Sequence, residues 1–284
     1  MLLAGALVVV LLMAAGLWWV LRPGEDPETA ACPYPVVSGV TSARPSGDNR
    51  ATIAAPSSGA VTVTETGFTQ ITNQGEVSIG AVVENTSSQV AYQTRGIFGA
   101  FEADGSYALG EAERFNYFFE IPIIRPGERA VIGTYAFLDR ASFNRTGNWI
   151  HVAQASLQLV QTQWISAADT GTFPAIIARL NTEKPPLAQD GRVTIYLAAD
   201  SDVCRKLGSR GMGIVFRDAG GAVVGGSYYP VRDPEFCASG GFTATAQVFD
   251  SKLPDADLAR TDLSAYCDLT PSSDLPPGPT QPVN

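Results

Sequence analysis

The side chains that could do chemistry in this sequence are four cysteines, a single histidine and scattered carboxylates. Cys32, Cys204, Cys237 and Cys267 occur in no CxxC or CxxH pattern, which argues against a metal site. Such cysteines, in a chain patterned like strands, are typical of an oxidising compartment, where they form disulfide bonds. We therefore treat all four as disulfide candidates.

The pairing of these cysteines is open, because four cysteines permit three connectivities. Cys204 and Cys237 fall in predicted loops at the same end of a run of up-and-down strands, which favours a bridge between them. Cys32 and Cys267 would then join the segment near the N-terminus to the end of the last predicted domain.

Catalysis by histidine has one candidate, His151, which follows Trp149 and Ile150 in a stretch of alternating polarity. A catalytic histidine needs a nucleophile and an orienting carboxylate. The sequence contains neither GxSxG nor HExxH, the motifs that would supply a serine nucleophile or a zinc site. We interpret His151 as a structural or surface residue. We expect no catalytic residue, no cofactor and no metal ion, and we predict that the protein is not an enzyme.

Four carboxylates in or near loops could bind Ca²⁺, namely Asp200, Asp202, Asp255 and Asp257. No Asp-x-Asp-x-Asp-Gly pattern accompanies them, so solvated acidic loops are the simpler interpretation. Glycoside hydrolysis requires only two well-placed carboxylates. An envelope hydrolase therefore stays an alternative, although the sequence singles out no pair.

Glycine clusters and aromatic clusters have structural interpretations as well. Segments 208–213 and 220–226 are glycine-rich but lack complete dinucleotide or phosphate-loop motifs, and tight turns explain them. The aromatic runs 115–119 and 228–229 either form a ligand-binding patch or place alternate rings in a core. The alternation of side chains along a strand favours the core.

The elements that position these residues are predicted to be strands. Alternating or β-branched stretches bounded by turn residues occupy most of the chain after residue 60. The expected strands are 61–64, 76–83, 96–101, 130–135, 151–160, 191–199, 211–218, 222–229 and 242–249. No stretch outside the N-terminus has convincing helical periodicity, so the expected fold class of this part is all-β.

An internal repeat divides the β-rich part into two. Residues 75–79 (GEVSI) match residues 191–195 (GRVTI), and a similar offset relates Gly96 to Gly213. An offset of about 115 residues is too long for a solenoid unit and suits one β-sandwich of about 100 residues per repeat.

Turn and core positions in the repeats carry a resemblance to a known module. The first repeat contains 82–86 (VVENT), 101–105 (FEADG) and 126–128 (PGE), and the second contains 216–221 (FRDAGG) but no Pro-Gly-Glu. Both resemble the FxLYD-type domain, an immunoglobulin-like β-sandwich of bacterial surface and secreted proteins, although neither contains Leu-Tyr-Asp. The resemblance covers 67–165 and 173–269. It implies a fold and a surface location, and it implies no catalytic residue.

The first 22 residues bear on the compartment. Residues 2–21 form an uncharged apolar run of about 30 Å as a helix, the thickness of a bilayer core, with Trp18 and Trp19 near its end. An uncleaved anchor is favoured, with a cleaved signal peptide or a lipoprotein signal at Cys32 as alternatives, because no basic residue precedes the run. Arg22 weakly favours a cytoplasmic C-terminal side, but the cysteines favour the extracytoplasmic side.

The predicted organisation places two immunoglobulin-like β-sandwiches after one transmembrane helix. Its parts are a transmembrane anchor (1–22), a Pro/Ser/Gly-rich stalk (23–60), a first domain (61–166), a second domain (172–269) and a disordered Pro-rich tail (270–284). The 284-residue chain is 45% hydrophobic and 17% charged, enough apolar content for more than one core.

These features together predict a function class rather than a named activity. The net charge of −9 disfavours nucleic acid as a partner, because phosphate binding needs clustered Lys and Arg. We predict a single-pass membrane protein whose extracytoplasmic domains form a non-catalytic interaction or structural module of the cell envelope. Its partner would be another envelope protein or a cell-surface ligand. An accessory subunit of an integral membrane complex is the main alternative.

Overall fold

The computed structural model describes most of the β-rich part of the chain. The described residues are 34, 60–71, 75–110, 118–139, 150–165, 171, 173–189, 192–231, 233, 235–248 and 256–269. All belong to one compact unit, Tyr34–Asn284. The predicted anchor (1–22), all of the stalk (23–60) except residues 34 and 60, and the tail (270–284) lie outside them. Within the described ranges, no helix has the length and apolarity needed to cross a membrane.

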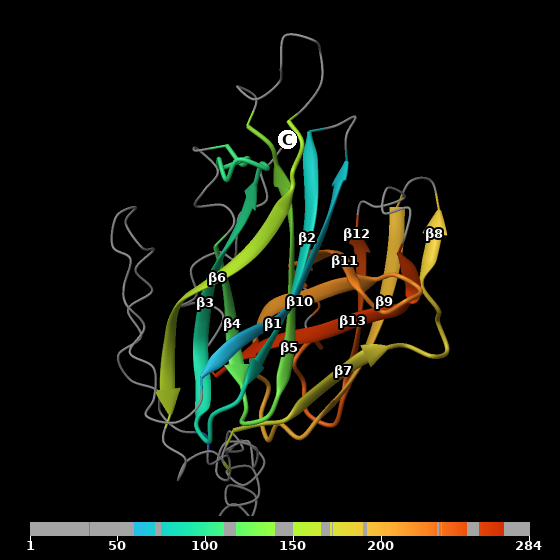
Figure 1. Ribbon diagram of the computed structural model, residues 1–284. Helices are drawn as coiled ribbons and strands as arrows, with labels where there is room; N and C mark the ends of the chain where they lie inside the picture. Colours follow the sequence, from blue (N-terminus) through green and yellow to red (C-terminus); the bar gives the residue numbers. More distant parts are fainter. Residues whose placement is uncertain are drawn as a thin grey trace, which may run out of the picture. The chain divides into compact units, whose positions relative to one another are not determined.

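The described structure is all-β, as predicted, and its first half forms two antiparallel sheets (Figure 1). One sheet has the order β1-β2-β5, and the other has the order β4-β3-β6. These strands are β1 (Val61–Ile71), β2 (Glu76–Asn85), β3 (Val90–Phe101), β4 (Phe118–Ile124), β5 (Arg129–Phe137) and β6 (Gln154–Ile165).

The second half repeats this strand order. Its sheets are β12-β9-β7 and β11-β10-β13, which correspond position by position to β5-β2-β1 and β4-β3-β6; a short β8 also pairs with β9. The strands are β7 (Ile176–Leu180), β8 (Leu187–Gln189), β9 (Arg192–Ser201), β10 (Gly208–Arg217), β11 (Val223–Tyr229), β12 (Phe242–Val248) and β13 (Asp257–Asp268). The same order in both halves is what an internal repeat produces.

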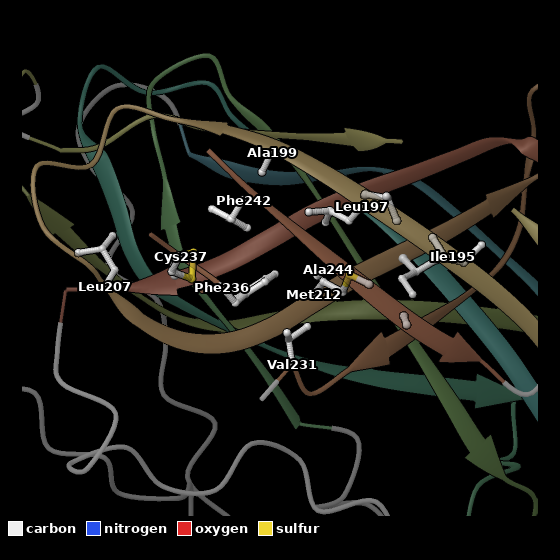
Figure 2. Close-up of a cluster of buried hydrophobic side chains, with 14 of the residues drawn as sticks. Ile195, Leu197, Ala199, Leu207, Met212, Val231, Phe236, Cys237, Phe242 and Ala244 are labelled. Atoms are coloured by element: carbon white, nitrogen blue, oxygen red, sulfur yellow. A yellow bond between two sulfur atoms is a disulfide. The ribbon is translucent and has the colours of Figure 1, made fainter. Parts of the chain in front are cut away.

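Each half supplies most of one apolar core, although Val90 and Tyr92 of β3 belong to the second core and Tyr266 of β13 to the first. In β2, Val77 and Ile79 enter the first core. In β9, Ile195 and Leu197 enter the second, where they gather with Met212 and other apolar side chains (Figure 2). In β12 the alternation of side chains leaves one face buried and one exposed, whereas in β2 and β3 residues of both faces are buried.

The two halves contact each other through glycine residues in their strands. A Cβ atom at Gly80 of β2 would lie 2.2 Å from the backbone oxygen of Gly225 in β11. A Cβ atom at Gly133 of β5 would lie 2.2 Å from the backbone nitrogen of Ser227. Sheets normally pack with their backbones about 10 Å apart, so glycine is what allows this approach. We call this contact the glycine seam.

Small polar side chains and valines complete the glycine seam. The Ser78 hydroxyl donates to the Gly226 carbonyl over 2.9 Å, and the Ser264 hydroxyl accepts the Val131 N–H over 2.9 Å. Val131 also belongs to a small buried cluster of valines, Val82, Val131 and Val215, contributed by both halves. The glycine seam is therefore held by hydrogen bonds and by a small buried apolar cluster.

A buried ion cluster also joins the halves. The Arg95 guanidinium of β3 donates to Glu120 of β4 over 2.7 Å, and Arg210 of β10 contacts the same carboxylate over 3.2 Å. Arg210 also pairs with Asp268 of β13 over 3.1 Å, and the Tyr92 hydroxyl donates to Asp268 over 2.6 Å. Asp268 is fully buried. We call these five residues the buried ion cluster.

The structure corrects two interpretations of local sequence. The glycine-rich segments 208–213 and 220–226 are interpreted as tight turns, although the expected strands 211–218 and 222–229 overlap both of them. In the structure β10 begins at Gly208, and Gly225 and Gly226 lie inside β11, so the strand prediction is confirmed there and the turn interpretation is wrong. Only Gly220 and Gly221 lie in the β10–β11 turn. Strand β13 was not predicted, because its charged residues interrupt the apolar alternation. Two of them, Asp262 and Asp268, pair with Arg217 and Arg210.

Candidate functional site

A small cavity lies where the terminal strands of four sheets meet. It has a volume of about 180 Å³, and its walls come from β4, the start of β5, β7 and β13. Each of these strands is the last strand of its sheet. The aliphatic residues of the wall include Ile121, Ile123, Ile176, Ile177 and Leu263. The cavity is therefore bordered by sheet edges from both halves, with aliphatic side chains and polar groups in its wall.

A carboxylate, Glu128, lies in the wall of this cavity. It follows Pro126 and Gly127 in a turn whose Gly127 has φ 72°, the left-handed conformation that glycine adopts readily in a type II turn. The Glu128 carboxylate accepts the Arg125 backbone N–H over 2.7 Å. Burial raises the pKa of Glu128 above its usual 4.5, although this hydrogen bond and the Arg125 charge oppose the rise.

Replacing Glu128 by glutamine is expected to change the pH dependence of stability. Because the folded-state pKa is raised, the folded protein binds more protons than the unfolded chain between pH 4.5 and that raised pKa. The free energy of unfolding of the wild type should therefore fall, relative to Glu128→Gln, as pH rises through this window. Urea unfolding of both proteins from pH 4 to 7 measures it; parallel curves would contradict the expectation.

Two large apolar side chains among the described residues are exposed, and both lie on strands at the same edge of one sheet of the second half. Ile177 of β7 is 64% exposed and Leu187 of β8 is 49% exposed. Both strands pair with the same side of β9, with Ile177 opposite Asp200 and Leu187 opposite Thr194. They form one edge of their sheet, which we call the β7–β8 edge, and Ile177 also lines the cavity.

The carboxylates of the buried ion cluster do not face this cavity. Glu120 and Asp268 are held by arginines on both sides of the contact between the halves. Nearby, the Tyr228 ring stacks on the Tyr266 ring at 6.2 Å, and burial raises the pKa of Tyr228 to about 12. The cluster and these rings are suited to holding the halves together.

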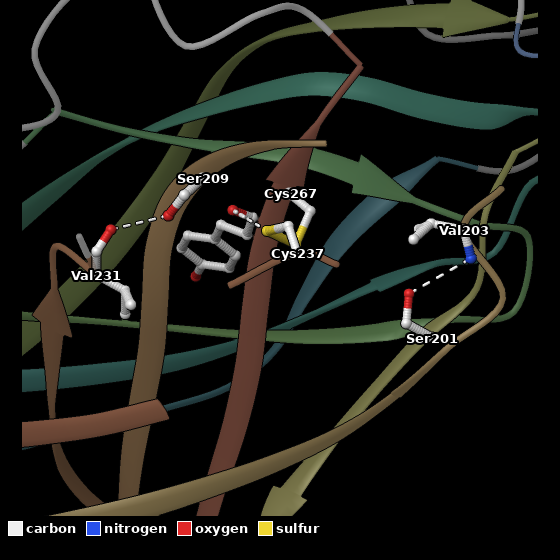
Figure 3. The surroundings of a disulfide bond; sticks show 7 residues. Ser201, Val203, Ser209, Val231, Cys237 and Cys267 are labelled. Atoms are coloured by element: carbon white, nitrogen blue, oxygen red, sulfur yellow. Dashed lines mark hydrogen bonds between the residues drawn. A yellow bond between two sulfur atoms is a disulfide. The ribbon is translucent and has the colours of Figure 1, made fainter. Parts of the chain in front are cut away.

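The cysteines are paired differently from the favoured prediction. Cys237 and Cys267 form a disulfide with a Cα–Cα distance of 5.7 Å (Figure 3), so the Cys204–Cys237 and Cys32–Cys267 bridges are wrong. The error arose because strand β13 was not predicted. This strand contains Cys267 and brings it next to the turn that contains Cys237. Cys204 is disulfide-bonded too, and its backbone N–H donates to the Tyr34 hydroxyl over 2.8 Å. Cys32 lies outside the described residues.

Disulfide mapping should recover two bridges from the full chain. Non-reducing digestion followed by mass spectrometry is expected to yield a peptide pair that joins Cys237 to Cys267. With these two joined, Cys32 is the cysteine left in the chain for Cys204, two positions before the Tyr34 that contacts Cys204. We expect a Cys32–Cys204 pair. Detection of Cys204 with Cys237, or of free thiols, would contradict this pairing.

The remaining candidate residues are dispersed. His151 is exposed just before β6. Asp200 pairs with Arg179, Asp257 pairs with Arg260, and Asp202 accepts the Ala175 N–H. Asp255 lies outside the described residues. Within the part of the chain that the structure describes, no three His, Cys, Asp or Glu side chains are grouped to hold a metal ion.

The aromatic runs take part in packing where the structure describes them. Phe119 of β4 is buried and meets Phe98 at 5.2 Å between ring centres. Tyr228 packs between Phe119 and Tyr266. Residues 115–117 lie outside the described ranges. The interpretation of these rings as core residues is therefore correct for Phe119 and Tyr228.

Sequence reasoning had no signal for the cavity. Its walls come from residues spread between Ile121 and Tyr266, and only the Pro-Gly-Glu turn among them was noted from sequence. Comparison with known proteins adds no assignment, since no protein-family model matches the chain and no curated protein matches it significantly.

Proposed function

We propose that this protein is a membrane-anchored, non-catalytic interaction module whose two halves are FxLYD-type, immunoglobulin-like domains on the extracytoplasmic side. The observation that carries the proposal is the cavity at the four sheet edges, beside the exposed β7–β8 edge. Exposed apolar edges are uncommon on soluble domains, because they invite pairing with other chains.

The strand order supports the immunoglobulin-like part of the proposal. In each half the first, second and fifth strands form one sheet, and the third, fourth and sixth strands form the other. The six strands of the second half in this count are β7, β9, β10, β11, β12 and β13, without the short β8. Immunoglobulin-like domains likewise place strands A, B and E in one sheet and C and F in the other. The Cys237–Cys267 disulfide supports an oxidising compartment.

Crosslinking on intact cells tests location and partner together. The full chain would be crosslinked with a membrane-impermeant reagent, purified and analysed by mass spectrometry. We expect crosslinks between lysines such as Lys184 and Lys206 and one stoichiometric envelope protein. Absence of reaction at these lysines on intact cells would contradict the extracytoplasmic location. Crosslinks without any partner would contradict the interaction role.

A further inference from the structure

The β7–β8 edge offers backbone hydrogen bonds that a second strand could take. Strand β7 is the last strand of its sheet, and among the described strands it pairs only with β9. A terminal strand presents unpaired N–H and C=O groups along its free side, and extended peptides bind such edges by adding a strand. Many proteins protect such edges with charged side chains or proline. Strand β7 carries one charged residue, Arg179, which is paired with Asp200 of β9, and Ile177 is 64% exposed at the edge.

The cavity beside this edge has the size for one aliphatic side chain and has aliphatic residues in its wall. Its volume of about 180 Å³ is well below the roughly 300–1,000 Å³ of pockets that hold drug-sized ligands. Its wall combines polar groups with aliphatic side chains, and Ile177 is one of the latter, so a residue of an added strand would reach the cavity from the edge. One anchoring side chain in a pocket next to a strand is how strand addition gains specificity.

Charge around the cavity favours a basic neighbour for that aliphatic residue. Glu128 lies in the wall, and its carboxylate accepts the Arg125 backbone N–H and lies within reach of the Arg125 charge, but it makes no salt bridge with a described residue. Arg129 beside it is already paired with Glu65. On β7, Arg179 is paired as well. The net charge of −9 also favours encounter with basic segments.

We infer that the β7 edge binds an extended segment of a partner protein, one aliphatic residue of which fills the cavity while a neighbouring Lys or Arg faces Glu128. This inference rests on the proposed interaction function and names the kind of partner. The segment would pair antiparallel or parallel with Ile176–Leu180, so about five residues would be ordered on binding.

Selection from a random octapeptide phage library on the full-length protein in detergent tests the inference. Selected sequences are expected to share an aliphatic residue next to Lys or Arg. A synthetic peptide of the consensus sequence should bind Ile177→Lys at least tenfold more weakly than the wild type. The matched control, Thr245→Lys, adds the same charge to an exposed position on the other terminal strand of the same sheet, and it should bind as the wild type does.

Further readouts separate the possible outcomes. Glu128→Gln should weaken binding of the basic peptide but not of its version with Gln in place of Lys or Arg. Hydrogen exchange should slow at the Ile176 and Ala178 amides, which alternate with the residues bonded to β9 and so point to the free side of β7. Failure to select any peptide that distinguishes the wild type from Ile177→Lys would overturn the inference. So would a concentration-dependent dimer lost in Ile177→Lys, because the occupant is then a second copy. If cells still yield a crosslinked envelope partner in those cases, the proposed function stands and only the site is wrong.

Discussion

Replacing Gly133 by alanine is expected to lower the free energy of unfolding by roughly 3 kcal/mol or more, at or above the upper end of ordinary overpacking. The added Cβ atom would lie 2.2 Å from the Ser227 nitrogen and 2.5 Å from the Ile214 carbonyl oxygen. Both are backbone atoms, which cannot rotate away as a side chain can, so β5 must move away from β10 and β11. Urea denaturation followed by tryptophan fluorescence and circular dichroism measures the loss.

A matched substitution separates this clash from the general effect of replacing glycine. Gly171 is exposed, and a Cβ atom added there would have nothing within 4 Å, so Gly171→Ala should leave stability within about 0.5 kcal/mol of the wild type. Gly80→Ala, which meets the Gly225 oxygen at 2.2 Å, should resemble Gly133→Ala. Equal stability of Gly133→Ala and Gly171→Ala would show that the seam is not close-packed in solution.

Replacing Asp268 by alanine is expected to cost about 3–5 kcal/mol, as is usual when one partner of a buried ion pair is removed. Asp268 is fully buried and accepts hydrogen bonds from the Tyr92 hydroxyl and from Nε and Nη2 of Arg210. Its removal takes a counter-charge away from Arg210. The Arg210 side chain is only 12% exposed, so water solvates its charge poorly. The loss is measured by the same urea titrations.

Two other substitutions are expected to lower the free energy of unfolding by less than Asp268→Ala does. Tyr92→Phe removes one hydrogen bond to Asp268 and should cost roughly 1–3 kcal/mol. Asp200→Asn breaks the Arg179 pair, whose side chains are 51% and 69% exposed, and should change stability by less than about 1 kcal/mol. A loss at Asp268 no larger than that at Asp200 would mean that water reaches the buried ion cluster.

The glycine seam and the buried ion cluster act on the same contact, with consequences for the binding edge. The cavity takes its walls from both halves, β4 and β5 on one side and β7 and β13 on the other. A change that separates the halves must therefore also open the cavity. Gly133→Ala, tested with a selected peptide, should bind more weakly even though it touches no cavity residue.

Local patterning was enough to predict the all-β class and most of the strands. The alternation in Val193–Ala199 reflects the period of two that a half-buried strand must show, and the β-branched residues of Val77–Val83 suit a strand buried on both faces. The repeat was visible for the same reason, since equal strand order requires similar spacing of turns. The aromatic residues Phe119 and Tyr228 could be assigned to packing because strand periodicity already placed alternate rings inward.

Contacts between distant residues were decided only by the tertiary structure. Glycines in a row predict turns locally, and nothing near Gly225 or Gly226 in sequence indicates that Gly80 and Gly133 press against them. The Cys237–Cys267 bridge, the pairing of Arg210 with Asp268 and the cavity depend on β13, whose charges resemble a solvated segment until their partners are in place. Local propensity acts over a few residues, whereas close packing and charge pairing act between segments that only folding brings together.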